Sequence, residues 1–130
     1  MENYPQNRVT PQSIEKLYKN EIFVFGSNSE GNHTGGAARL ALYWGAIMGE
    51  GVGLKGQTYA IPTMFSTTRY IKEYVEEFIA FAKEHPELTF LVTEIGCGIA
   101  GFSPNAIAPL FKNAVHIQNI HLPKRFWKYL

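Results

Sequence analysis

The chain has 130 residues, a formal net charge of +1 and 18% charged residues, which is typical of one soluble globular domain. This small charge argues against a large surface for duplex DNA or acidic membranes, and no apolar run reaches the ~20 residues that span a bilayer. One cysteine, Cys97, excludes a disulfide framework and a multi-cysteine zinc site. The start MENYPQNRVT lacks the pattern of a signal peptide, so we expect a cytoplasmic protein without a membrane partner.

Two features of the composition bear on function. Every acidic residue is a glutamate, which excludes Asp-based triads, Asp-rich calcium loops and paired-Asp magnesium sites. The histidines have no metal-ligand spacing, so we expect neither a metal nor a cofactor. The 12 glycines fall in two stretches, between Gly26 and Gly56 and between Gly96 and Gly101. Such clustering is not typical of scattered turn glycines, so both stretches are candidates for a site.

Hydrophobic spacing and chain-breaking residues divide the chain into helices and strands. In chain order we predict a short helix after Thr10-Pro11, a strand over 21–25, a helix over 35–46, a glycine-rich loop over 45–56, a strand over 58–62, a helix over 69–84, a strand over 90–95, a short helix from Ser103-Pro104 and a strand over 116–122. The helix over 69–84 is the clearest, because its apolar residues form one stripe. The first short helix would carry Ile14, Leu17 and Tyr18 on one face.

Strands that alternate with helices predict an α/β fold with a mainly parallel sheet. We treat residues 1–130 as a single domain in which residues 1–9 are frayed. Residues 124–130 form a basic-aromatic tail, a mixture that single-strand nucleic-acid binders also show. Such rings more often pack on the body of the protein, so we expect no nucleic-acid partner.

The first glycine loop (residues 26–38) follows a predicted strand and opens a predicted helix. It follows Phe25 with Gly26-Ser27-Asn28 and then contains Gly31-Asn32-His33-Thr34-Gly35-Gly36-Ala37-Ala38. Backbone N–H groups and the positive end of a helix dipole would meet there, which suits a phosphate or ribose phosphate. The spacing matches neither a Walker A loop nor a dinucleotide-binding GxGxxG. The alternative is a glycine-rich hairpin or tight helix–sheet packing.

The second glycine loop (residues 95–102) follows another predicted strand with the sequence Ile95-Gly96-Cys97-Gly98-Ile99-Ala100-Gly101-Phe102. Alternating glycines let backbone amides approach an anion closely. Ligands of α/β sheets bind at the carboxyl ends of strands, so two such loops could grip a diphosphate from both sides. Cys97 could be a nucleophile with a lowered pKa, or simply a small residue in a tight space.

We therefore predict a binding site formed by both loops. Its candidate ligand-binding residues are Gly26, Ser27, Asn28, His33, Thr34, Gly35, Gly36, Ala37, Gly96, Cys97, Gly98, Ile99, Ala100, Gly101 and Phe102. Asn28 would bond a ribose hydroxyl. If the protein is an enzyme, Asn28 and His33 are the candidates for positioning a substrate or water, because no general base is obvious.

Together the two loops resemble the macro domain family of ADP-ribose-binding modules. Phe25-Gly26-Ser27-Asn28 is similar to the family's strand that ends in a ribose-contacting Asn, and residues 95–102 are similar to its diphosphate-wrapping loop. Residues 10–126 also resemble a group of small macro-like proteins of bacteria and their phages, which share FGSN, GGAA, YAIPT and IGCGIAGF. The resemblance implies a three-layer α/β/α fold with a mixed central sheet and an ADP-ribose-like ligand or ADP-ribosylated target.

The sequence departs from the family at two places. Many macro domains bind the adenine amino group with an early Asp, which is missing here; Glu21 or Glu94 could replace it. Hydrolytic members carry an Asp, a Lys or paired Glu near the glycine loop, and residues 35–45 contain none of these. Binding of ADP-ribose or a related nucleotide is thus the first hypothesis. An ADP-ribosyl hydrolase acting on a protein, nucleic acid or metabolite is the second, and a protein-interaction module that has lost the ligand is the third. The oligomeric state stays open.

Overall fold

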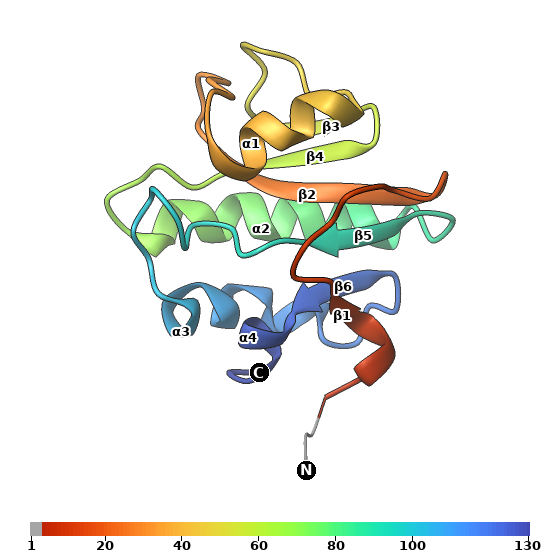
Figure 1. Cartoon of the computed structure of the whole chain (residues 1–130). Coiled ribbons are helices and arrows are strands. Elements are labelled where there is room, and N and C mark those ends of the chain that lie inside the picture. The colour runs from red at the N-terminus through yellow and green to blue at the C-terminus, as the bar shows by residue number, and fades with distance from the viewer. Residues whose placement is uncertain (1–3) are drawn as a thin grey trace.

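The computed structural model describes residues 4–130 as an α/β structure built on one six-stranded sheet (Figure 1). The strands are β1 (Val9–Thr10), β2 (Glu21–Ser27), β3 (Gly53–Lys55), β4 (Thr58–Pro62), β5 (Thr89–Val92) and β6 (Ile120–Pro123). Their spatial order is β1-β6-β5-β2-β4-β3, and only the β3–β4 pair is antiparallel. The expected α/β class with a mainly parallel sheet is confirmed.

Helices cover both faces of this sheet unequally. They are α1 (Gly36–Ala41), α2 (Thr68–Lys83), α3 (Pro104–Ile107) and α4 (Lys124–Trp127), with 3-10 helices η1 (Gln6–Arg8), η2 (Leu42–Trp44) and η3 (Ala108–Ala114). The predicted stripe of α2 buries Ile71, Val75 and Phe78 in the larger core, behind the sheet in Figure 1. The shorter α1 packs on β2 and helps to close a smaller core on the other face.

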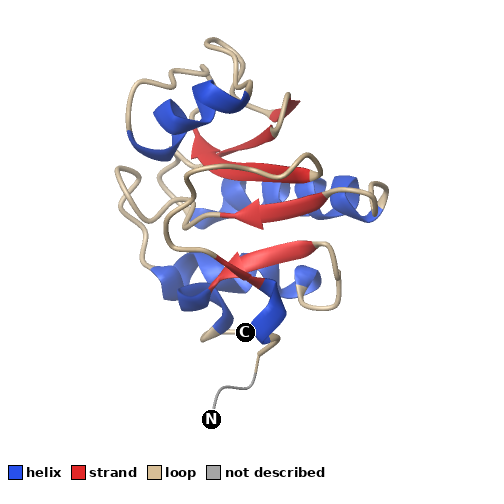
Figure 2. Ribbon diagram, turned by 45° about the vertical axis from the view of Figure 1, so that its right-hand side comes forward, coloured by secondary structure: helices blue, strands red, loops and turns tan. Residues whose placement is uncertain are grey.

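Strand β2 divides its side chains between these two cores. Ile22 and Val24 lie in the larger core, whereas Phe23 and Phe25 lie in the smaller one. This alternation follows from the two-residue period of a strand. Parallel neighbours flank β2 on both sides, and the central strands point the same way in Figure 2. A strand in this position is covered on both faces, which explains its continuous apolar run. The predicted buried strand is therefore found.

The helix predicted after Thr10-Pro11 is absent: residues 11–20 form a connection without a helix. Strands β6 and β5 separate β1 from β2, so this connection must cross about 14 Å of sheet. The connection must also run back along the length of the strands. The reason is that β1 and β2 are parallel, so β2 starts at the edge of the sheet opposite to the one where β1 ends. Ten residues in a helix span only about 15 Å, so the chain runs extended in front of the sheet (Figure 1). Ile14 and Leu17 pack on the smaller core, but Tyr18 is exposed.

Two other strands differ from the prediction. The last strand begins at Ile120 rather than at residue 116, because Asn119 donates hydrogen bonds to the carbonyls of Ala82, His85 and Leu88 and holds a turn there. Histidine 116 therefore lies in a turn, so the expected opposite orientation of His116 and His121 on one strand does not apply. The short β3 lies inside the predicted 45–56 loop. The sequence does not predict this strand, because the many glycines of the stretch favour a loop.

Both ends of the described chain are built into the fold. Residues 1–3 lie outside the described residues, but the fraying expected for residues 4–9 is wrong, since η1 and β1 are formed and Arg8 is buried. In the tail, Phe126 and Trp127 are buried in the larger core, and the basic residues Lys124, Arg125 and Lys128 are exposed. Two of the three tail rings thus pack on the body, as that interpretation of the tail expects, whereas Tyr129 is exposed.

Candidate functional site

The two glycine loops meet at the carboxyl edge of the sheet. The first follows β2 and the second follows β5, which is the parallel neighbour of β2. The end of β4, on the other side of β2, brings Thr63 and Met64 to the same place. Together they enclose a cavity of about 270 Å³, here called the cleft. The placement expected from the glycine pattern is therefore found.

Most of the predicted site residues line this cleft. They are Gly26, Ser27, Asn28, Thr34, Gly35, Gly36, Ala37, Gly96, Gly98, Ile99 and Ala100. Four others, His33, Cys97, Gly101 and Phe102, do not belong to its lining. The lining also contains residues that were not among the predicted binding residues: Asn32, Ala38, Thr63, Met64, Thr93, Glu94 and Ile95. Their roles in binding stay predictions.

Gly26 lets the three strand ends approach one another. A Cβ at this position would lie 3.1 Å from Oγ1 of Thr63, 3.3 Å from N of Gly96 and 3.4 Å from Cα of Ile95. A side chain there would push the end of β4 away from the second glycine loop. The cleft therefore depends on the missing side chain of Gly26.

Asn28 shapes the first glycine loop from within. Its Oδ1 accepts a hydrogen bond of 2.9 Å from the backbone N–H of Asn32, and its Nδ2 donates one of 3.3 Å to the carbonyl of Asn32. An amide side chain can make further bonds through its second N–H and second lone pair. Asn28 can therefore both hold the loop and contact a ligand hydroxyl in the cleft.

Part of the glycine content serves packing rather than the cleft. A Cβ on Gly51 would lie 1.9 Å from the carbonyl oxygen of Asn28, so the 45–56 loop packs directly on the first glycine loop. The hydroxyl of Ser27 donates a hydrogen bond to the carbonyl of Gly51 and fixes this contact. The alternative interpretation, close backbone packing, thus explains several glycines between residues 31 and 56.

His33 belongs to this packing. Its ring is 1% exposed, Nε2 lies 3.0 Å from the carbonyl oxygen of Glu50, and the ring meets Phe25 edge-on. Nδ1 is buried and has no hydrogen-bond partner among the described residues. This geometry positions the 45–56 loop, and His33 lies outside the lining of the cleft.

The second glycine loop contributes Gly98, Ile99 and Ala100 to the lining of the cleft. Within the described residues, no group accepts a hydrogen bond from the amides of Gly98, Ile99 or Ala100. A Cβ on Gly98 would meet nothing within 4 Å, so the space beside it is open. This stretch can therefore donate several hydrogen bonds to phosphate oxygens.

Cys97 does not have the properties of an activated nucleophile. Its Sγ lies 3.5 Å from the carbonyl oxygen of Ile95, and the side chain is half-buried. Burial raises the pKa of the Cys97 thiol, the negative charge of Glu94 raises it further, and Arg125 acts in the opposite direction. The shift is opposite to the lowered pKa that an activated nucleophile requires.

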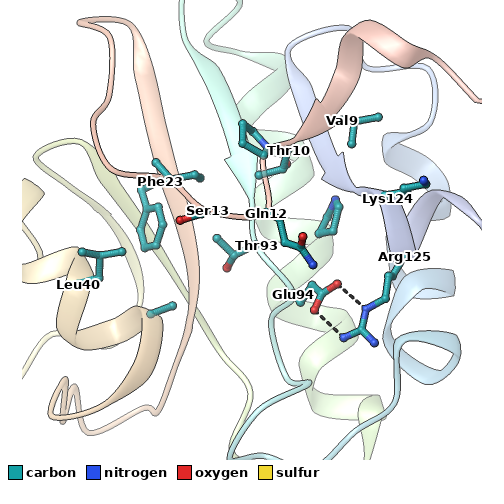
Figure 3. Close-up of a pocket in the computed structure, with 14 residues that line it drawn as sticks. Val9, Thr10, Gln12, Ser13, Phe23, Leu40, Thr93, Glu94, Lys124 and Arg125 are labelled. Atoms are coloured by element: carbon teal, nitrogen blue, oxygen red, sulfur yellow. Dashed lines mark hydrogen bonds and ion pairs between the residues drawn. The ribbon is translucent and has the colours of Figure 1, made fainter.

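A larger cavity of about 550 Å³, here called the groove, adjoins the cleft. Its lining consists of Val9, Thr10, Pro11, Gln12, Ser13, Ile14, Phe23, Ala37, Leu40, Thr93, Glu94, Pro123, Lys124 and Arg125. Figure 3 shows Leu40 on one side, Lys124 and Arg125 on the other, and Gln12 and Ser13 between them. The sequence does not predict the groove, because the pattern of residues 11–18 indicates a helix, whereas residues 11–14 form part of the groove wall without a helix.

Glu94 and Arg125 form an ion pair in the groove. The carboxylate accepts one hydrogen bond from Nε and one from Nη2 of Arg125, each 2.7 Å long. These bonds hold the pKa of Glu94 below its usual value, although partial burial opposes the shift, and they raise the pKa of Arg125. Of the two acidic residues considered as replacements for the missing Asp, only Glu94 lies here. Glu21 starts β2, at the opposite end of that strand.

Residues 4–130 lack two other kinds of feature. No three His, Cys or Glu side chains gather there in a way that could hold a metal ion. None of the helices in this part of the chain has the length and apolar character needed to cross a membrane.

Comparison of the chain with models of protein families, with curated proteins and with solved structures found no match.

Proposed function

We propose that this chain binds ADP-ribose or a related nucleoside diphosphate, with the diphosphate in the cleft and the nucleoside in the groove. One observation carries the proposal: two glycine loops from neighbouring parallel strands face one cleft, and that cleft opens into a larger groove. Such a crevice at strand carboxyl ends is the usual ligand position in open α/β sheets. The partner would be the free ligand or an ADP-ribosylated target.

The two cavities suit the two parts of such a ligand. The cleft is lined by glycines, hydroxyls and open amides, which match phosphate and ribose oxygens. The groove has apolar walls from Ile14, Phe23 and Leu40, which match the faces of a base. Its volume of about 550 Å³ lies in the ~300–1,000 Å³ range of small-molecule sites.

The proposal agrees with the resemblance of the sequence to macro domains. In that interpretation, α2, α3 and η3 form one outer layer, the sheet forms the middle layer, and α1 with the 11–20 connection forms the other. The helix α1 has only six residues, so the open amides of the second glycine loop contribute more to anion binding than the dipole of α1.

The test is a calorimetric titration of the wild type and Gly98→Val with ADP-ribose, compared with AMP, NAD and ribose 5-phosphate. A valine at residue 98 meets no atom within 4 Å of its Cβ and should fold, but its branches would occupy the cleft. We expect selective binding of ADP-ribose by the wild type and at least a ten-fold loss in the variant, about 1.4 kcal/mol.

The matched control is Ala80→Val, which adds a valine on the exposed face of α2, away from both cavities. It should keep the wild-type affinity, and circular dichroism should show both variants folded. No binding of any of the four compounds by the wild type would refute the proposed function. Full affinity in a folded Gly98→Val variant would remove the second glycine loop from the site.

A further inference from the structure

The cleft and the groove meet at a junction formed by Ala37, Thr93 and Glu94, which line both cavities. Thr93 fixes the backbone there, because its N–H and its hydroxyl both donate to the carbonyl of Val24, at 3.1 and 2.7 Å. Ala37 is too small to interact beyond contact. Glu94 is therefore the side chain at the junction that can recognise a polar group.

Arg125 fixes the orientation of this carboxylate. The two 2.7 Å bonds join both oxygens of Glu94 to one edge of the guanidinium (Figure 3). A carboxylate offers about four acceptor positions, and Arg125 occupies two of them. The side chain of Glu94 is 34% exposed, so its remaining lone pairs are accessible from the cavities. The pair thus presents an oriented hydrogen-bond acceptor at the junction.

We propose that Glu94 accepts a hydrogen bond from a ribose hydroxyl and selects ribonucleotides over deoxyribonucleotides. This inference rests on the proposed function: a ligand with its diphosphate in the cleft and its base in the groove must place the connecting sugar at the junction. A carboxylate is the group that dinucleotide-binding folds use for a ribose hydroxyl, because it is a strong acceptor that a deoxyribose leaves unpaired. Arg125 is a positioning residue in this arrangement.

Arg125 has a second effect, on charge. Glu94 is the charged residue among those that line the cleft, and its negative charge would repel a diphosphate. The adjacent guanidinium offsets that charge. Removing the charge of Glu94 should therefore weaken sugar selection without weakening phosphate binding, whereas removing the charge of Arg125 should weaken both.

The experiment measures dissociation constants by calorimetry for ADP, 2′-deoxy-ADP, 3′-deoxy-ADP and pyrophosphate. In the wild type, ADP should bind about ten-fold or more tightly than at least one deoxy compound, as expected for a hydrogen bond to a charged acceptor. In Glu94→Gln this preference should fall toward one, while pyrophosphate affinity stays equal or rises. Arg125→Met should lose both the preference and pyrophosphate affinity, and Arg125→Lys should retain the latter.

The control is Glu50→Gln, the same substitution at a carboxylate that pairs with Lys55 at 3.6 Å and lines neither cavity. It should leave the ratio of ADP to deoxy-ADP affinities unchanged. Equal binding of ADP and both deoxy compounds by the wild type would overturn this inference and leave the proposed function standing. If ADP-ribose, ADP and pyrophosphate all fail to bind, the proposed function fails, and this inference fails with it.

Discussion

The side chain of Arg8 joins the two ends of the described chain. Its guanidinium donates hydrogen bonds of 2.8–3.0 Å to the carbonyls of Ala114, Val115 and Ile120, and it lies over the Trp127 ring. The indole N–H of Trp127 in turn donates to the carbonyl of Arg8. The side chain is 3% exposed, so water cannot easily replace it as a donor.

Arg8→Met should therefore destabilise the fold strongly. The variant keeps a similar length but leaves three carbonyls without their donor, two of them in buried bonds and that of Val115 in a part-buried one. Each such loss is worth roughly 1–3 kcal/mol. We expect a fall of about 3 kcal/mol or more in the free energy of unfolding, measured from urea transitions. Arg39→Met, on the exposed surface of α1, should change it by less than about 0.5 kcal/mol. Equal midpoints for the two variants would show that the Arg8 bonds contribute little.

At the scale of elements, the local sequence pattern predicts a helix or strand correctly where nearby residues determine it. The stripe of α2 and the apolar run of β2 predicted their elements to within two residues. Ser103-Pro104 predicted α3, because a cap and a first-turn proline act locally. The 11–20 connection failed because its path depends on the position of β1 in the sheet, which no local pattern encodes.

The candidate site shows the same division. The position of both glycine loops at strand ends follows from sequence and sheet rules. The different roles of the glycines do not follow from the sequence, because they depend on tertiary packing: a Cβ on Gly51 would collide with the carbonyl of Asn28, whereas a Cβ on Gly98 would meet open space. The partnership of Glu94 with Arg125 joins residues 31 apart in the chain, and no spacing rule would have found it.

His121 on β6 is a titratable residue that should make the free energy of unfolding depend on pH. His121 is half-buried; burial lowers its pKa, the nearby positive charge of Arg8 lowers it further, and Glu21 opposes this. The unfolded chain then binds more protons than the folded chain between the folded pKa and the ordinary value of about 6.5. Stability is thus fully present above about pH 6.5 and is lost as the pH falls through the folded pKa.

His121→Gln should remove this part of the pH dependence. Each unit by which the folded pKa lies below the unfolded value corresponds to about 1.4 kcal/mol. We expect the variant to lose less stability than the wild type between about pH 7 and pH 5, as measured by urea unfolding at each pH. Parallel pH profiles for the two proteins would assign the acid sensitivity to other groups.

At the scale of the molecule, the candidate site joins segments that are far apart in the sequence. The first glycine loop follows β2 and the second follows β5, and more than half of the larger core is built from the chain between and after them. A diphosphate held between the loops would connect these segments directly. Binding should therefore have two separable effects, one on global stability and one on the loops themselves.

Hydrogen exchange distinguishes these effects. Ligand at about 100 times its Kd adds about 2.7 kcal/mol to the free energy of unfolding, which slows every amide that exchanges only through global unfolding, including those buried in α2. The amides of Gly98, Ile99 and Ala100 have no acceptor among the described residues and should exchange quickly in the free protein. With saturating ADP-ribose we expect them to slow markedly, together with the amides of residues 35–37, while the edge strand β3 changes little. Slower exchange in α2 without any change in the two loops would place the ligand elsewhere on the molecule.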